Sequence, residues 1–445
     1  MFTGALKNIL GNNKLLYIAG GLVVGVIILV MIIFLGRIGG TPEGGQRAEL
    51  TFWGVFDSEE DFRSSINAYQ SQNPQVRINY RQFSFEDYEK SLVNAFADGT
   101  GPDIFMIHNT WLPKHKGKIT PLPQQIAGEK TPLFTLKDFK DQFVDVAEKD
   151  LVVGSDIYGL PLYVDTLALY YNKDIFNSLG IANPPKTWSE FNDSVEKITI
   201  SENNIISRSG AAIGTARNVN RSTDILSLLM LQSGVPMTND DNTSAEFTKI
   251  TDGQDVGQVA LEYYTDFANP AKRVYTWNNA QHYSVDAFQE GLAAMMFNYA
   301  HQVALLRSKA PRLNFGVAPM PQLNTSQTAN YASYWVPTVS KFSKNSVAAW
   351  KFLVYLSSAP GVVPYLNSAT HPVARRDLVD QQQNEPEIGV FAKQALSAKS
   401  WYQIDNLAIE NILADLIDDV NFKRRTVAEA LRAAENKITL LMQRQ

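Results

Sequence analysis

The sequence contains no cysteine, and this absence excludes several kinds of chemistry at once. Without a thiol there is no disulfide, no thiolate nucleophile, no cysteine-ligated zinc site and no cysteine that could carry a lipid. The 445 residues are enough for two or three domains, and domains of that size bury a sufficient core without disulfides. Hydrophobic residues make up 45% and charged residues 19%, which is typical of a globular protein.

Histidine is scarce, and acidic residues outnumber basic ones. The 5 histidines never recur at the i, i+4 spacing of a helical metal site, so we expect no metal. A formal charge of −5 without a basic stripe argues against a nucleic-acid partner. The sequence also lacks a nucleophile elbow, a phosphate-binding glycine loop and a dinucleotide fingerprint, so we expect neither a cofactor nor an enzyme. With 45 acidic residues, a glycan-processing enzyme that uses two carboxylates stays open as an alternative.

One long apolar run stands near the N-terminus, at residues 15–35. It carries no charge and reaches the length of about 20 residues that a helix needs to cross a bilayer. A cleavable signal peptide has a shorter apolar region followed by small residues, whereas Arg37 follows this run closely. A buried helix of a soluble domain would be expected to show a polar face. We therefore predict an uncleaved transmembrane helix.

The charges around this run indicate its orientation. Lys7 and Lys14 precede it, so the positive-inside rule places residues 1–14 in the cytoplasm and the C-terminal body outside. Residues 36–47 are rich in glycine and are interpreted as a flexible tether. The predicted location is the cell membrane, with a single pass and an extracytoplasmic body.

The body begins with alternating strands and helices. Residues 48–53, 76–80 and 103–107 show strand patterns, and apolar residues at helical spacing lie between them. Asp57 and Glu60 form a capping-box pattern at the start of the first helix. The βαβαβ order predicts an α/β fold with a parallel sheet and right-handed crossovers.

The loops after these strands carry the first candidate binding residues. In parallel sheets ligands bind beyond the carboxyl ends of the strands. Aromatic side chains suit the apolar face of a sugar ring, and carboxylates and amides suit its hydroxyls. For the tryptophans, simple cover of the sheet edge remains an alternative. The candidates in these loops are Trp53, Phe56, Asp57, Phe83, His108, Asn109 and Trp111.

Longer motifs follow in a recognisable order. They are GTGPDIFMI at 99–107, YGLPLYVDTLALYYNKDIFNSLGIANPPKTWSEF at 158–191, AFQEGLAAMMFN at 287–298 and SKNSVAAWKFLVYLSS at 343–358. Over residues 48–445 the chain resembles the extracellular solute-binding proteins that serve sugar ABC importers, the maltose-binding-like group. This resemblance implies a two-lobed periplasmic-binding-protein fold of type II, with a hinge and an interlobe cleft. The implied lobes are residues 48–163 plus 336–375, and residues 164–335 plus 376–445.

The resemblance also implies contacts near the first crossing between the lobes. Asp165 follows that crossing, where the family often has an acidic residue that contacts sugar. Tyr299 and His301 stand where the family usually has a glycine and a stacking tryptophan, so the pocket is expected to depart from the usual one. A surface position for His301 remains an alternative.

Further contacts are implied in loops and joints of the body. Arg217 and Asn218 lie in a loop that often contacts ligand in this family, although polar loops are common. Trp335 lies in a joint that faces the cleft, and Trp401 resembles a late tryptophan that stacks on sugar. By contrast, Trp188 and Trp350 are expected to pack in the core.

These observations predict a membrane-anchored, extracytoplasmic substrate-binding protein of an ABC importer. It would bind a mono- or oligosaccharide in the interlobe cleft and deliver it to the permease subunits. The expected partners are the sugar, the permease and the membrane at residues 15–35, with a monomeric body. The alternative is a sensory or scaffolding ectodomain that binds a small solute other than a sugar, because a tethered receptor can signal instead of delivering.

Overall fold

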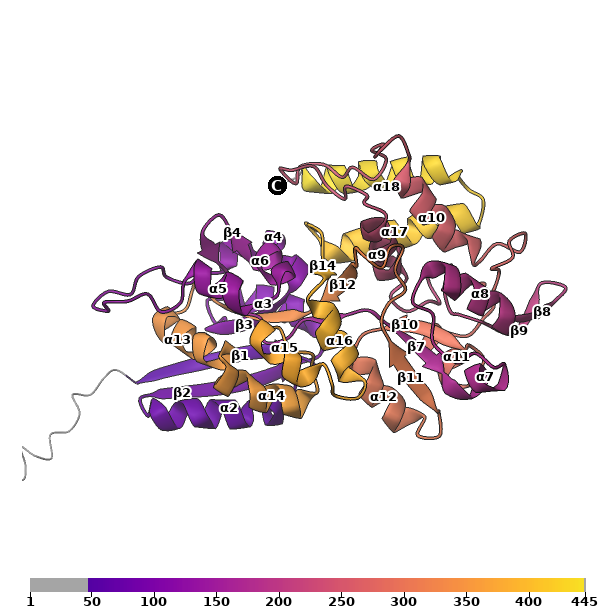
Figure 1. The fold of residues 1–445 in the computed structure, drawn as a ribbon. Helices are drawn as coiled ribbons and strands as arrows, with labels where there is room; N and C mark the ends of the chain where they lie inside the picture. Colours follow the sequence, from indigo (N-terminus) through magenta and orange to yellow (C-terminus); the bar gives the residue numbers. More distant parts are fainter. Residues whose placement is uncertain (1–46, 444–445) are drawn as a thin grey trace, which may run out of the picture. The chain divides into compact units, whose positions relative to one another are not determined.

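The structure is a computed structural model that describes residues 47–443 (Figure 1). The predicted cytoplasmic segment, the predicted transmembrane helix at 15–35 and residues 36–46 of the predicted tether lie outside the described residues. Between residues 47 and 443 no single helix has both the length and the hydropathy of a membrane span. Only α13 (Ser346–Ser357) and α14 (Ala359–Ala369) reach those limits together, and their axes are bent by 69°.

A four-stranded sheet begins the described chain, in the order β13-β3-β1-β2. Its strands are β1 (Ala48–Val55), β2 (Val76–Phe83), β3 (Ile104–His108) and β13 (Trp335–Val339). Strands β1 and β3 are parallel, which confirms the prediction for the first units. Strand β13 is antiparallel to β3, with Trp335 paired to His108, so the sheet is mixed and not purely parallel as predicted.

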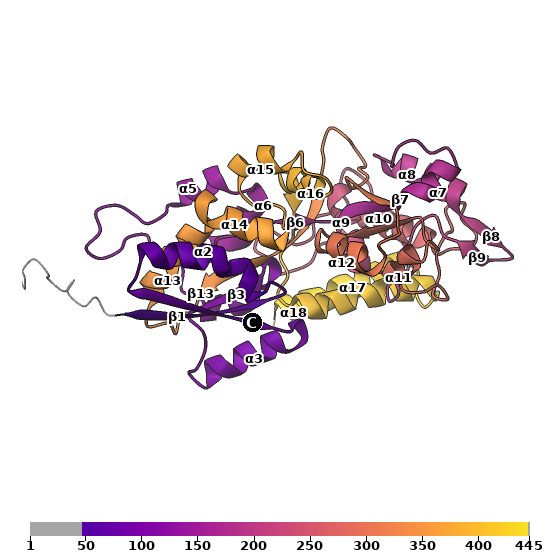
Figure 2. The ribbon, with the colours of Figure 1, turned by 90° about the horizontal axis from the view of Figure 1, so that it is seen from below.

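Helices cover both faces of this sheet (Figure 2). On one face α2 (Glu59–Gln72) lies beside α13 and α14, and the ring of Phe52 contacts the rings of Phe62 and Phe352. On the other face lies α3 (Phe85–Ala97), where Phe96 contacts Phe105 at 5.1 Å between ring centroids. Because successive side chains of a strand point to opposite faces, this sheet is buried from both sides.

Helix α2 begins one residue later than the sequence pattern indicated. Its N-cap is Ser58, and the Asp61 carboxylate accepts a hydrogen bond from the Ser58 N–H at 2.7 Å. The predicted capping role of Asp57 is therefore wrong. The Asp57 carboxylate is instead buried and bonded to Tyr365 and His371, which are distant in the sequence.

Two three-stranded sheets follow in the rest of the chain. The first is antiparallel and has the order β10-β7-β11, from β7 (Ala168–Asn172), β10 (Met295–Asn298) and β11 (Phe315–Ala318). The second has the order β14-β12-β6, from β6 (Asp165–Thr166), β12 (Asn330–Ser333) and β14 (Ala398–Lys399). The two-stranded hairpins are β4 (Val152–Val153) with β5 (Asp156–Ile157), and β8 (Ile200–Glu202) with β9 (Ile205–Arg208).

The remaining helices surround these sheets. Helix α8 has Thr187 as its N-cap, because the Thr187 hydroxyl accepts from the Glu190 N–H at 3.2 Å. In chain order, the remaining helices are η1 (Asn109–Trp111), α4 (Leu112–His115), η2 (Lys116–Lys118), α5 (Leu136–Gln142), α6 (Asp145–Leu151), α7 (Lys173–Ser178), α8 (Trp188–Ile198), α9 (Ser222–Gln232), α10 (Val256–Asp266), α11 (Ser284–Gln289), α12 (His301–Lys309), α15 (Arg376–Gln382), α16 (Ile388–Ala395), α17 (Asn406–Asn421) and α18 (Val427–Met442).

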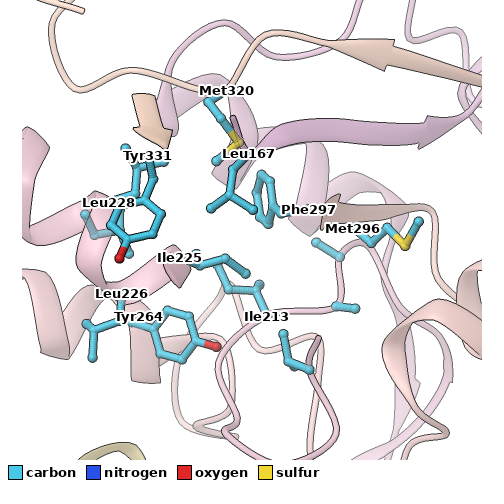
Figure 3. Packing of buried hydrophobic residues seen from close by; sticks show 14 of the residues in the cluster. Leu167, Ile213, Ile225, Leu226, Leu228, Tyr264, Met296, Phe297, Met320 and Tyr331 are labelled. Atoms are coloured by element: carbon cyan, nitrogen blue, oxygen red, sulfur yellow. The ribbon is translucent and has the colours of Figure 1, made fainter. Parts of the chain in front are cut away.

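A large apolar core surrounds β7, β10 and α9. Figure 3 shows Ile225 of α9 close to Phe297 of β10 and to Leu167, which lies between β6 and β7. Helix α9 is apolar on most of its circumference, which is typical of a helix buried on all sides. Trp188 belongs to this core and Trp350 is fully buried under the first sheet, so both predictions of packing roles are confirmed.

Candidate functional site

A cavity of about 530 Å³ lies beyond the carboxyl ends of β1 and β3, where they approach the first turns of α9, α12 and α17. Its volume falls in the range that small-molecule sites occupy. The cavity is therefore at the sheet edge that the strand order predicted. The residues expected at a site that do line it are Phe56, His108, Trp111, Asp165, Tyr299, His301 and Trp335.

One wall of the cavity is aromatic. The rings of Phe56 and Phe85 stack at 5.7 Å, and the edge of Trp335 meets Phe56 at 5.9 Å and Trp111 at 4.9 Å. Phe56 is 59% exposed, and its backbone has a φ of +65°. A bulky side chain is uncommon in this left-handed region, and holding it there costs about 1–3 kcal/mol. The fold thus keeps an exposed ring at the cavity mouth in spite of strain.

The opposite wall begins at Asp165, which is nearly fully buried. Its two carboxylate oxygens accept hydrogen bonds from the Ala300 N–H at 2.9 and 3.1 Å, and one also accepts from the Thr166 N–H at 2.8 Å. Burial raises the pKa of Asp165 to about 7, even though His371 and these donors act in the opposite direction. The carboxyl group thus connects β6 to the N-terminus of α12 and titrates near neutral pH.

This raised pKa predicts a pH dependence of stability. A carboxyl whose pKa is higher in the folded chain binds extra protons there, so its stabilising contribution is present at acid pH and lost as the pH rises towards 7. We expect the free energy of unfolding of the native chain, relative to Asp165→Asn, to fall by about 1–3 kcal/mol between pH 5 and pH 8. Urea denaturation of both proteins across this range measures the difference. A difference that stays constant with pH would contradict the titration of Asp165.

A group of polar side chains extends this wall from α9. The Tyr299 hydroxyl donates to the Asp224 carboxylate at 2.8 Å, and burial raises the pKa of Asp224. The Arg221 guanidinium carbon lies 5.2 Å from the Tyr299 ring centroid. Arg221 lines the cavity, and among residues 47–443 it forms no ion pair with a carboxylate within 4.0 Å.

Helix α17 and β3 complete the lining. The Trp111 indole N–H donates to the Asn406 side-chain oxygen at 2.7 Å, which fixes the tryptophan ring. His108 contacts the hydroxyls of Thr110 at 2.8 Å and Ser333 at 3.0 Å, and burial lowers the pKa of His108 to about 3. His301 stands exposed at the start of α12, with its ring 6.3 Å from that of Tyr299. The lining therefore offers neutral donors and acceptors beside the aromatic wall.

Of the residues expected from the first loops, four lie outside the cavity lining, and three of these, Trp53, Phe83 and Asp57, pack beside the first sheet or behind the lining. Trp53 and Phe83 are half-buried and pack against each other at 4.5 Å, with Arg81 over both rings. Their side chains belong to the face of the sheet that α3 covers. Asp57 lies behind the lining, where its contacts with Tyr365 and His371 occupy both carboxylate oxygens.

The other four expected residues are placed elsewhere. Asn109 and Trp401 line a neighbouring cavity of about 360 Å³, and the Asn109 side chain donates to Asp150 at 2.9 Å. Arg217 forms ion pairs with Asp415 and Asp418 on α17. Asn218 donates to backbone carbonyls of the loop at 278–281. The polar loop that the sequence singled out is thus used for packing, and Arg221, which follows it, reaches the cavity.

Several lining residues were missed by the sequence interpretation. On α17 a signal was present, because Asn406, Ile409, Glu410 and Leu413 follow the i, i+3, i+4, i+7 spacing of one helix face. Phe85 and Thr110 lie in or next to the loops that the strand order singled out, although neither was named as a candidate. No local signal marks the other missed polar or aromatic residues of the lining, which are Glu86, Tyr163, Arg221, Thr223, Asp224, Ser227, Tyr331, Ser333, His371 and Gln403.

The described part of the chain contains no group of three or more histidine, aspartate or glutamate side chains placed to hold a metal ion. The sequence had led us to expect no metal site, and the cavity chemistry is that of hydrogen bonding and ring stacking.

Comparison with known proteins adds independent information. Residues 56–363 match the family described as bacterial extracellular solute-binding protein. A binding protein of Brucella abortus (strain 2308) is 26% identical over 299 residues, which are 66% of this chain and 68% of that protein. The maltotriose-binding protein of Pyrococcus abyssi (strain GE5 / Orsay) is 25% identical over 347 residues, which are 75% of this chain and 68% of that protein.

Solved structures share the fold. The sugar-binding protein of the phytopathogen Xanthomonas citri has a TM-score of 0.74 at 20% identity, over 89% of this chain and 97% of that one. The cyclic α-maltosyl-1,6-maltose binding protein of Arthrobacter globiformis has a TM-score of 0.73 at 19% identity, over 89% of this chain and all of that one. The mixed α/β, two-lobed architecture of type II is thereby confirmed. Because the family match spans more than half of the chain, the protein belongs to the bacterial extracellular solute-binding proteins.

Proposed function

We propose that this chain is the substrate-binding component of an ABC importer and binds a mono- or oligosaccharide in the main cavity. The observation that carries the proposal is the pairing of two walls. The exposed ring of Phe56 and its neighbours offer a flat apolar surface, and Asp165, Arg221 and Asp224 offer hydrogen-bonding groups opposite. A sugar ring has an apolar face and an edge of hydroxyls, so it matches both walls.

The names of relatives support this ligand class. They include the maltotriose-binding protein already described, and the maltodextrin-binding and galactooligosaccharide-binding proteins of Bacillus subtilis (strain 168). A relative of Deinococcus radiodurans is named as an ABC transporter-binding protein. On this basis the chain delivers its solute to permease subunits and is a binding protein, not an enzyme.

We propose that the body has two lobes, one formed by residues 48–163 with 336–375 and the other by residues 164–335 with 376–445. The cavity lining draws on both, since Phe56 and Trp111 belong to the first and Tyr299 and Glu410 to the second. A ligand that contacts both lobes favours the closed state over the open one, which is the usual mechanism of such receptors.

A saccharide panel tests the proposal. Maltotriose, mannobiose and α-D-tagatose are titrated into the purified chain by calorimetry, and thermal unfolding is followed with each. A ligand at a hundred times its Kd stabilises the folded state by about 2.7 kcal/mol, so a binding sugar should raise the midpoint clearly. Peptides and polyamines serve as controls. Stabilisation by these controls and by no carbohydrate would reject the sugar and favour a receptor for another solute.

Phe56 provides a prediction at the level of one residue. Phe56→Ala should weaken binding of the panel saccharide by about ten- to thirtyfold, because it removes the exposed ring of the aromatic wall. The unfolding midpoint should change little, since the ring is 59% exposed. Phe342→Ala is a matched control, because Phe342 is 57% exposed and lies outside the cavity lining. Equal affinities of the two variants would remove Phe56 from the site.

We also propose that residues 15–35 anchor the chain in the cell membrane, with residues 1–14 in the cytoplasm, residues 36–47 as a short tether and the monomeric body outside. The uncharged length of the run supports this proposal. The full-length protein should sediment with membranes after gentle lysis and require detergent for release. The same chain without residues 1–46 should be soluble, and release of the intact chain by salt alone would contradict the anchor.

A further inference from the structure

The loop that follows β13 lies at the end of the first sheet opposite to the main cavity. Val339, the last residue of β13, pairs with Ile104, the first residue of β3, so the loop begins where β3 starts. The cavity lies beyond the other ends of β1 and β3. Because β1 runs parallel to β3, this loop is at the end of the sheet where the chain enters the body.

Hydrogen bonds fix the loop to the starts of β1 and β3. The Ser340 N–H donates to the Asp103 carbonyl at 2.8 Å, and the Ser343 hydroxyl donates to the Asp103 carboxylate. The Asn345 side chain donates to the Glu49 carbonyl at 3.3 Å. The loop is therefore held at both ends, and its side chains have a set position beside the first residues of the body.

This loop carries an aromatic and basic surface. Phe342 is 57% exposed, and Lys341 and Lys344 on either side of it are exposed as well. The Lys341 N–H donates to the Lys118 carbonyl at 2.9 Å, which places η2 and its two lysines beside the loop. We call this surface the basic patch, and its residues are Lys116, Lys118, Lys341, Phe342 and Lys344.

The lysines of the basic patch have no ion-pair partner in the described body. Among residues 47–443 none of them pairs with a carboxylate, whereas the nearby Lys114 and Lys351 both do. The carboxylates beside the loop have uncharged partners, since Asp103 accepts from a serine and a threonine and Glu49 accepts from the Asn79 amide at 2.7 Å. An exposed ring among unpaired lysines is the composition that binds the surface of an anionic membrane.

We propose that the basic patch is a membrane-contact surface that binds the headgroups of anionic phospholipids. The inference rests on the proposed anchor at residues 15–35 and adds an orientation of the body to it. Residues 36–47 span at most about 40 Å when fully extended, so the end of the body where β1 starts stays close to the bilayer. The patch is at that end, and the main cavity at the opposite end of the sheet remains open to the solute.

Electrostatic attraction sets the strength of this contact. Each lysine near an anionic surface strengthens it about fivefold, and the gain is lost beyond a Debye length of about 10 Å in 0.1 M salt. Phe342 adds an apolar ring that can enter the headgroup region. The contact is therefore reversible and sensitive to salt.

The absence of cysteine allows a site-specific test on the full chain. Val347→Cys, in the first turn of α13 beside the patch, carries a polarity-sensitive fluorophore, and Leu440→Cys on α18 carries the same label as a control. Both positions are exposed, at 40% and 54%. Each labelled chain is reconstituted into phosphatidylcholine vesicles with or without phosphatidylglycerol, and its emission is followed during a salt titration.

We expect the label at position 347 to shift to shorter wavelengths in vesicles that contain phosphatidylglycerol, and to return in high salt. Lys341→Gln combined with Lys344→Gln should lower the equilibrium constant of the contact about twenty-five-fold. Lys309→Gln combined with Lys437→Gln removes the same charge from exposed positions outside the patch and should leave the shift unchanged. The label at position 440 should not respond.

The outcomes separate this inference from the anchor. A chain that leaves the vesicles in high salt rejects the anchor and overturns the inference with it. A chain that stays with the vesicles while the label at position 347 ignores phosphatidylglycerol overturns the inference alone. An equal shift in both kinds of vesicle, or in detergent without lipid, also overturns it, because a neutral surface or a second copy of the chain then covers the patch.

Discussion

Replacing Asp57 by alanine is expected to lower the free energy of unfolding by about 3–5 kcal/mol. The carboxylate is buried at the end of β1 and bonds both the His371 imidazole and the Tyr365 hydroxyl. Removing it leaves two buried polar groups unpaired, and one of them carries charge when protonated. This loss is a large fraction of the stability of an ordinary globular protein.

Urea denaturation at pH 7 measures this effect on the purified chain. Asp98→Ala is the matched control, since Asp98 is an exposed aspartate that ends α3. Asp57→Asn should be milder than Asp57→Ala, because an amide oxygen still accepts from Tyr365. A loss below about 1 kcal/mol in Asp57→Ala would show that the site relaxes without its carboxylate.

Trp335→Ala should cost about 3–5 kcal/mol of stability and also abolish most of the saccharide affinity. The indole is the centre of the aromatic wall, where it contacts five other rings: Phe56, Phe85, Tyr88, His108 and Trp111. Without it the exposed rings lose the support that holds them in place, and the Kd for the panel saccharide should rise at least about thirtyfold.

Trp350→Ala separates the two effects of this substitution. Trp350 is a fully buried indole of α13 and lies outside the cavity lining, so its loss should lower stability by a similar amount and leave affinity intact. Calorimetry below the unfolding range of both variants provides the comparison. Equal affinity of Trp335→Ala and Trp350→Ala would place the aromatic wall outside the binding site.

The parts of the fold that could be predicted are those with local patterns. Strand patterns of apolar residues predicted β1, β2 and β3, and apolar residues at helical spacing predicted the helices between them. The order of these elements located the sheet edge where Phe56 and Trp111 line the cavity. The addition of β13 could not be predicted, because Trp335 pairs with His108 and the two are far apart in the sequence. Nothing local encodes such a pairing.

The errors at the site have a related cause. Arg217 and Arg221 are only four residues apart, but Arg217 is paired with carboxylates on α17 that are distant in the sequence, and Arg221 is left to line the cavity. Asp57 was taken for a residue that binds ligand or caps a helix, but its partners at positions 365 and 371 draw it behind the lining. Side-chain chemistry was therefore visible in the sequence, while the assignment of each group to ligand or protein required the tertiary contacts.

The antiparallel strand β13 also bears on the order in which the chain is made. Val339 completes the sheet by pairing with Ile104, and the whole second sheet and two of the three strands of the third are synthesised between them. Strand β3 therefore lacks its outer neighbour until most of the polypeptide has been synthesised, and contacts of such large sequence separation form slowly. We expect the nascent chain to stay open for a correspondingly long time, which suits the extracytoplasmic location that we propose for the body.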